Sequence, residues 1–137
     1  MAISRSLVEA LLARAKASPG REVCGLLLGG PGRITAAVPV ANIAADPARE
    51  FELDPAAHFA AIRAARAGGP AVIGHYHSHP SGLDRPSARD AEAAFDPSLL
   101  WMIVTTAKLS LWRVGDDANF VAETLRIGDG AGCESHA

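Results

Sequence analysis

The sequence has few aromatic residues, only two cysteines, no marked excess of either charge and no long apolar run. Aromatic residues make up 5% of the 137 positions, so a core must be built mainly from Ala, Val, Leu and Ile. Cys24 and Cys133 lie far apart, which argues against a disulfide-stapled secreted scaffold. The formal net charge is -2, which argues against nucleic acid or an anionic membrane as the main partner. No apolar run approaches the ~20 residues that a membrane-spanning helix needs.

The length of 137 residues suits one domain with one core. We expect a single domain over residues 1–127, followed by a flexible, glycine-rich tail at 128–137. The first residues lack the pattern of an export signal, because Glu9 and Arg14 interrupt the apolar positions. We therefore expect a cytoplasmic, reducing location.

Helices and strands are predicted in an interleaved order. Apolar positions recur at helical spacing over 4–17, and Asp54-Pro55 is typical of a second helix start. The turns near residues 30 and 116 indicate hairpins, and hence antiparallel pairs. We therefore predict an α+β fold, with a mixed sheet and helices packed on it. The strands are predicted at 22–30, 33–42, 50–53, 71–77, 99–105, 109–114 and 120–127, and the later helices at 54–67 and 87–95.

Three histidines stand at alternate positions, His75, His77 and His79, at the end of a predicted buried strand. Side chains alternate along a strand, so the last two of them point the same way. Imidazole nitrogens and carboxylate oxygens are typical zinc ligands, and a catalytic zinc usually takes three protein ligands and a water. A lone histidine is more often a packed or exposed residue, but this spacing with an acid downstream favours a metal site. His75 shares the alternation and could be a third ligand, but it lies deeper in the strand and is interpreted as a buried neighbour.

Ser87 and Asp90 support two interpretations that do not exclude each other. Ser-x-x-Asp before a helical segment is typical of a capping box. A carboxylate in the first turn of a helix is also held in place and free to face a metal ion. With the histidines upstream, Asp90 is predicted to be the third ligand.

Hydrolysis at a zinc site needs a base that takes a proton and passes it to the leaving amine. Several acids are available, and composition does not choose among them. Glu22 is a candidate because it opens an otherwise apolar strand, but it could also be merely the exposed first residue of that strand. Cys24 is interpreted as a small buried residue rather than a nucleophile.

These residues resemble the motif of the JAMM (MPN+) zinc metalloprotease family, in its short prokaryotic branch. The resemblance spans roughly residues 5–115 and is complete at every motif position. It implies a mixed, curved sheet flanked by helices, similar to that of the cytidine deaminases. The matching positions are Glu22, His77-Ser78-His79, then seven residues, Ser87, two residues and Asp90, with Asn42 and Phe51-Glu-Leu-Asp-Pro as further similarities.

The resemblance also implies roles for these positions. One Zn²⁺ per chain would be held by His77, His79 and Asp90. Glu22 would be the general acid/base, and Ser87 would hold the attacking water and the oxyanion, as such donors do elsewhere. Ser78, between the two histidines, receives no role.

The family cleaves peptide or isopeptide bonds after the C-terminal glycine of ubiquitin-like proteins. The resemblance to short prokaryotic members implies a ubiquitin-like sulfur carrier with a Gly-Gly C-terminus as the partner. The oligomeric state stays open, a homodimer included.

Two other functions are weighed against this one. A non-catalytic MPN-type binding module usually lacks some of the ligands, and none is missing here. A zinc deaminase would be expected to carry a Pro-Cys-x-x-Cys pair, which the sequence lacks. The sequence leaves open whether His58, His75 or Cys24 tunes the site.

Overall fold

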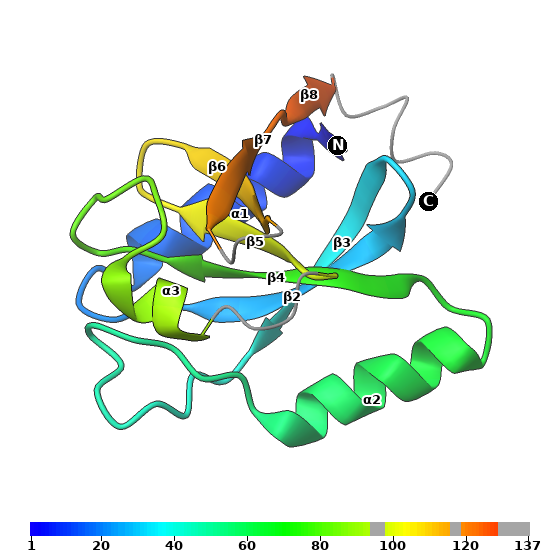
Figure 1. Cartoon of the computed structure of the whole chain (residues 1–137), viewed down its shortest axis with the longest axis horizontal. Helices are drawn as coiled ribbons and strands as arrows, with labels where there is room; N and C mark the ends of the chain where they lie inside the picture. Colours follow the sequence, from blue (N-terminus) through cyan, green and yellow to red (C-terminus); the bar gives the residue numbers. More distant parts are fainter. Residues whose placement is uncertain (94–97, 116–118, 129–137) are drawn as a thin grey trace.

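The computed structural model describes residues 1–93, 98–115 and 119–128. It contains a sheet of eight strands and three helices within these ranges (Figure 1). In chain order the elements are β1 (Ala2–Ser4), α1 (Arg5–Ala17), β2 (Cys24–Gly30), β3 (Arg33–Val40), α2 (Pro55–Arg66), β4 (Ala71–Ser78), α3 (Ala88–Ala93), β5 (Leu100–Val104), β6 (Leu109–Val114), β7 (Phe120–Glu123) and β8 (Arg126–Gly128).

The sheet is mixed, which confirms the predicted fold class. Its strand order is β7-β6-β5-β4-β2-β3-β1-β8. Strand β4 runs antiparallel to β2 and parallel to β5, so it lies in the middle of the sheet with partners on both sides. At its last residues it pairs His77 with Cys24 and with Ile103. The end of β4 is thereby fixed by two neighbouring strands.

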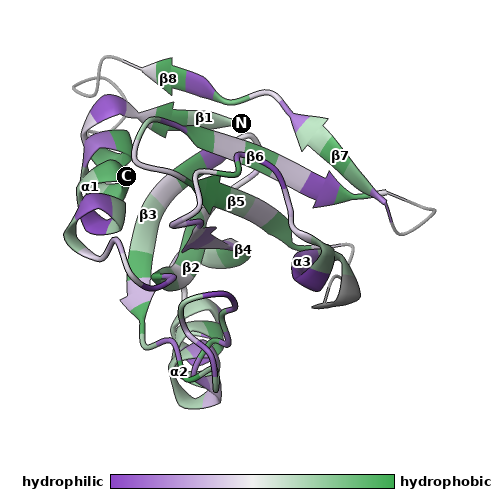
Figure 2. Ribbon diagram, turned by 90° about the vertical axis from the view of Figure 1, so that its left-hand side faces the viewer, coloured by the Kyte–Doolittle hydropathy of each residue, from purple (hydrophilic) through white to green (hydrophobic). Residues whose placement is uncertain are grey.

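Helix α1 covers one face of the sheet. Ser4 is its N-cap, and its hydroxyl oxygen accepts the Leu7 N–H at 3.2 Å, as expected for a serine at this position. The helix buries Val8, Leu11 and Ala15. Figure 2 shows polar and apolar residues side by side along its turns, which is typical of a helix with one buried face.

The two faces of the sheet carry different side chains because residues alternate along each strand. On the α1 face, Tyr76 and Met102 belong to the main apolar core. On the other face, Trp101 packs with Val114 and with the half-buried Phe51. His75 and His77 contact Trp101 and therefore lie on this second face.

Gly25 allows β2 to approach its neighbours in the α1-face core. A Cβ atom added at Gly25 would meet the ring of Tyr76 and the carbonyl oxygen of Val38. The fully buried Tyr76 ring therefore lies where a larger residue at position 25 would extend. Close approach is a known reason for glycine inside a strand.

Several element boundaries differ from those predicted. Strand β1 was not expected, and the predicted strand 120–127 is two strands, β7 and β8. Glu22 precedes β2 instead of opening it. The predicted strand 50–53 is reduced to one bridge between Asn42 and Leu53.

The predicted helix over 87–95 is confirmed for Ala88–Ala93, and its end lies outside the described residues. The turn at 116–118 and the tail after Gly128, with Cys133, also lie outside them. Within the described ranges, the helices are all too short or too polar to cross a membrane.

Candidate metal centre

His77 and His79 present their Nε2 atoms to each other at the end of β4. The two nitrogens are 3.0 Å apart, and both side chains are buried. An Oδ2 atom of Asp90 lies 3.1 Å from each of them. The structure thus brings the two histidines together on one side of the chain, and the loop after them returns Asp90 to the same place.

These three atoms form a compact triangle with sides of 3.0 to 3.1 Å. Ligands placed about 2.0–2.1 Å from a tetrahedral zinc lie roughly 3.3 Å from one another. The triangle is therefore close in size to one face of such a tetrahedron. Two imidazoles and one carboxylate are also a donor set that zinc accepts. The residues present fit a zinc ion.

Asp90 is held by the capping box that its sequence predicts. The Asp90 N–H donates to the Ser87 hydroxyl oxygen at 3.1 Å, and Asp90 Oδ2 accepts the Ser87 N–H at 2.8 Å. The two bonds fix the carboxylate at the start of α3. The capping interpretation is therefore confirmed, and the same carboxylate also lies 3.1 Å from both imidazole nitrogens.

His79 is oriented by a hydrogen bond on its other nitrogen. Its Nδ1 lies 2.8 Å from the carbonyl oxygen of Leu83. A carbonyl oxygen accepts hydrogen bonds, so Nδ1 carries the proton. The lone pair of Nε2 then points toward the other two atoms of the triangle. An N–H donated to a backbone carbonyl is the usual arrangement behind a metal-binding histidine.

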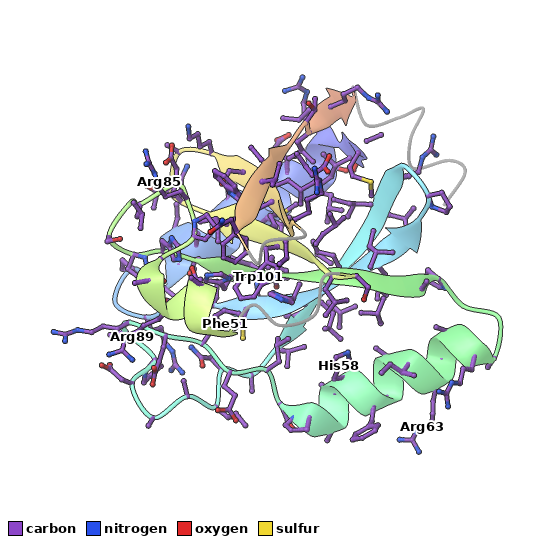
Figure 3. The ribbon with its side chains drawn as sticks, viewed as in Figure 1. Phe51, His58, Arg63, Arg85, Arg89 and Trp101 are labelled. Atoms are coloured by element: carbon purple, nitrogen blue, oxygen red, sulfur yellow. The ribbon has the colours of Figure 1, made fainter. Side chains whose placement is uncertain are left out.

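His77 is oriented by packing instead. Its ring stacks on Phe51 at a centroid distance of 4.1 Å and an angle of 17°. The Trp101 ring lies nearly perpendicular to it, at a centroid distance of 5.8 Å and an angle of 83°. Its Nδ1 atom is buried and has no hydrogen-bond partner among the described residues. Phe51 and Trp101, which the sequence did not identify as site residues, therefore hold this ring; Figure 3 shows both beside β4.

Burial and mutual contacts shift the pKa values of His77, His79 and Asp90. Burial lowers the pKa of His77, which is completely enclosed, more than the Asp90 carboxylate raises it. For His79, burial acts in the same direction, but Asp90 and the Leu83 carbonyl outweigh it and raise the pKa. Burial would raise the pKa of Asp90, yet the neighbouring rings of His77 and His79 hold it well below its usual range. Asp90 is therefore ionised, which is the form of a carboxyl that can bind a metal ion.

Glu22 reaches the same site from a different part of the chain. One carboxylate oxygen of Glu22 and one ring nitrogen each of His77 and His79 all lie within 4.8 Å of one another, a group that could hold a metal ion. Glu22 is buried, and its Oε1 has no hydrogen-bond partner within the described part of the chain. Burial raises its pKa from 4.5 to about 7, with His79 acting in the opposite direction. The alternative of an exposed strand residue is thereby excluded.

An open hollow of about 190 Å³ lies over these residues. Glu22, His79 and Ser87 line it together with Leu83 and Arg49. Ser87 is thus next to the site, and its hydroxyl hydrogen is free to donate because its oxygen accepts the Asp90 N–H. The hollow therefore opens Glu22 and His79 to the surface.

The remaining candidates lie beside the site or away from it. His75 is buried and packs edge-on against Trp101 at 4.4 Å, so it is a neighbour, as expected. Cys24 is buried, its thiol donates to the Val40 carbonyl, and burial raises its pKa to about 11. His58 lies on α2 beside a separate apolar hollow (Figure 3). None of the three is a member of the group that could hold a metal within the described ranges.

Comparison with known families identifies the class of protein that this fold and site define. The family described as prokaryotic homologs of the JAB domain matches residues 4–115. The chain belongs to this family.

Two curated relatives share part of the sequence. A desampylase of Haloferax volcanii is 41% identical over 91 residues, which is 65% of this chain and 66% of that protein. A probable TtuB-protein conjugate cleaving protease of Thermus thermophilus is 30% identical over 92 residues, which is 67% of this chain and 62% of that protein. The chain thus aligns with less than two thirds of the length of either relative.

Solved structures show the same fold. A protein of Desulfitobacterium hafniense superposes with a TM-score of 0.81 at 28% identity, covering 93% of this chain and 92% of the other. A JAB1/MPN domain protein of Archaeoglobus fulgidus superposes with a TM-score of 0.63 at 22% identity, covering 93% and 98%. The JAB1/MPN-type sheet expected from the motif is therefore confirmed.

Proposed function

We propose that this protein is a zinc-dependent peptidase or isopeptidase that cleaves after the C-terminal glycine of a ubiquitin-like protein. The observation that carries the proposal is the position of Glu22 over the triangle of His77, His79 and Asp90. A ligand set alone would suit a structural metal. A buried carboxyl within 4.8 Å of both imidazole nitrogens also supplies the general base that a hydrolytic site needs.

His77, His79 and Asp90 would hold the zinc, which supplies a Lewis acid that activates water and polarises a carbonyl group. Glu22 accepts a proton from the attacking water and delivers it to the leaving nitrogen. The bond between the water oxygen and the carbonyl carbon forms, and the C–N bond breaks. Ser87 donates its hydroxyl hydrogen to the oxygen on which negative charge develops.

The substrate class rests on the relatives and on the resemblance of the motif. One relative is named a desampylase and another a probable conjugate cleaving protease. We infer that the partner of this chain is a ubiquitin-like sulfur carrier with a Gly-Gly C-terminus. The end of that carrier would enter the hollow of about 190 Å³ that Glu22, His79 and Ser87 line.

The test uses zinc-loaded protein and a panel of ubiquitin-fold sulfur carriers extended beyond their terminal glycine. Mass spectrometry is expected to show loss of the extension after that glycine. The Glu22→Gln variant should keep about one zinc per chain by metal analysis and lose cleavage, because an amide cannot take up the proton. Carriers that bind but stay intact after long incubation would instead indicate a non-catalytic binding module.

A further inference from the structure

Ser78 lies between the two histidines, and its hydrogen bonds go to Val23, the residue next to Glu22. Its hydroxyl oxygen accepts the Val23 N–H at 2.9 Å. Its own N–H donates to the Val23 carbonyl oxygen, also at 2.9 Å. Ser78 is 3% exposed. Both backbone groups of Val23 are therefore bonded to a single residue of β4.

Asn42 holds the neighbouring residue from the other side. Its Nδ2 donates to the Glu22 carbonyl oxygen at 2.9 Å and to the Glu50 carbonyl oxygen at 3.0 Å. Its Oδ1 accepts the N–H groups of Ala44 and Glu52. This one side chain therefore ties Glu22 to the segment around residues 44–52.

Glu22 needs such support because it precedes β2 and has no place in the sheet ladder. Beyond the bond from Asn42, its N–H donates to the Pro47 carbonyl oxygen at 2.6 Å. The β2–β4 ladder ends at the pair Cys24 and His77. The two bonds of Ser78 extend this attachment by one residue, and so fix the backbone next to Glu22 against the strand that holds the histidines.

We propose that Ser78, assisted by Asn42, is a positioning residue that holds the Glu22 carboxyl over the His77–His79–Asp90 triangle. The proposal rests on the proposed hydrolase function. Ser78 acts through the backbone of Val23 and touches no reacting atom. A displacement of about 1 Å in a catalytic group can cost ~100-fold in rate, so a short attachment to the ligand strand has a large effect.

The experiment compares Ser78→Ala with Ser78→Thr, which keeps the hydroxyl, and with Ser4→Ala as the matched control. Ser4 is also buried, and its hydroxyl oxygen also accepts a backbone N–H, that of Leu7. It lies beside Ala2 and Ile3, and Ala2 pairs with Arg33 near the β2–β3 turn, far from the histidine end of the sheet. Amide hydrogen exchange by NMR, zinc content, kcat and KM are measured for each.

In Ser78→Ala, the Val23 amide should exchange at least ~10-fold faster, because its acceptor is lost. Zinc content and KM should stay near those of the unaltered protein, and kcat should fall ~10- to 100-fold. Ser78→Thr should retain both the Val23 amide protection and the kcat of the unaltered protein. Ser4→Ala should expose the Leu7 amide and leave kcat unchanged.

Unchanged kcat in Ser78→Ala, or an equal loss in Ser4→Ala, would overturn the proposal. If Ser78→Ala does not fold, Asn42→Ala replaces it and should lower kcat with zinc and KM retained; a normal kcat there overturns the proposal equally. If the unaltered protein binds zinc but cleaves no carrier, the hydrolase function fails. The Val23 amide exchange needs no substrate, so unchanged exchange in Ser78→Ala refutes the attachment independently.

Discussion

Replacing Glu22 by Gln should remove activity and make the metal-free protein more stable. Glu22 is 5% exposed, and burial raises its pKa from 4.5 to about 7. Between pH 4.5 and about 7, Glu22 is protonated in the folded state and ionised in the unfolded state. The free energy of unfolding therefore falls as the pH rises through this window. Glutamine has nearly the same shape and never ionises, so the variant escapes this loss.

The pKa rise from 4.5 to about 7 sets the size of the effect. At about 1.4 kcal/mol for each tenfold change, it amounts to an upper value of ~3 kcal/mol. In the presence of a chelator, Glu22→Gln should match the unaltered protein near pH 4 and exceed its free energy of unfolding by up to ~3 kcal/mol at pH 8. Urea titrations at several pH values measure this difference directly.

Asp90→Asn provides the contrast in the same experiment. The pKa of Asp90 lies well below its usual range because the rings of His77 and His79 stabilise its ionised form. Removing that charge should lower the stability of the metal-free protein at pH 8. If Glu22→Gln showed no gain between pH 5 and 8, or fell together with Asp90→Asn, the burial of an uncompensated carboxylate at position 22 would be refuted.

The other predictions concern the core, the thiol and the metal. Gly25→Ala should cost ~1–3 kcal/mol in urea unfolding because its Cβ would meet Tyr76, whereas Gly30→Ala, in the same strand with open space around it, should cost less. Cys24→Ala should retain cleavage, since a buried thiol with a pKa of about 11 is not a nucleophile at neutral pH; loss of kcat with normal folding would contradict this. A chelator should lower the melting temperature and abolish cleavage, and added zinc should restore both; cleavage that persists in metal-free protein would exclude a zinc hydrolase.

The arrangement of the histidines and Asp90 could be predicted because local rules determine it. Alternation along a strand places His77 and His79 on one face, and a capping box places Asp90 at a helix start. Both rules depend on residues close together in the sequence. The structure shows both arrangements as predicted.

Contacts between distant segments were harder to predict. Strand β1 has three residues, too few for a periodic pattern. Glu22 was placed in a strand because an apolar run follows it, but its backbone bonds to Asn42 and Pro47 instead. Asn42, noted from the sequence only as a family similarity, uses both ends of its amide to join Glu22 to the segment around Glu50 and Glu52. Sequence spacing carries no signal for these pairings.

The capping box at the start of α3 links the formation of that helix to the assembly of the metal-binding side chains. Two hydrogen bonds between Ser87 and Asp90 hold the first turn of α3, and the same carboxylate lies 3.1 Å from both imidazole nitrogens. Loop closure, helix initiation and completion of the donor set therefore depend on one another, and a substitution that weakens the turn should lower zinc retention.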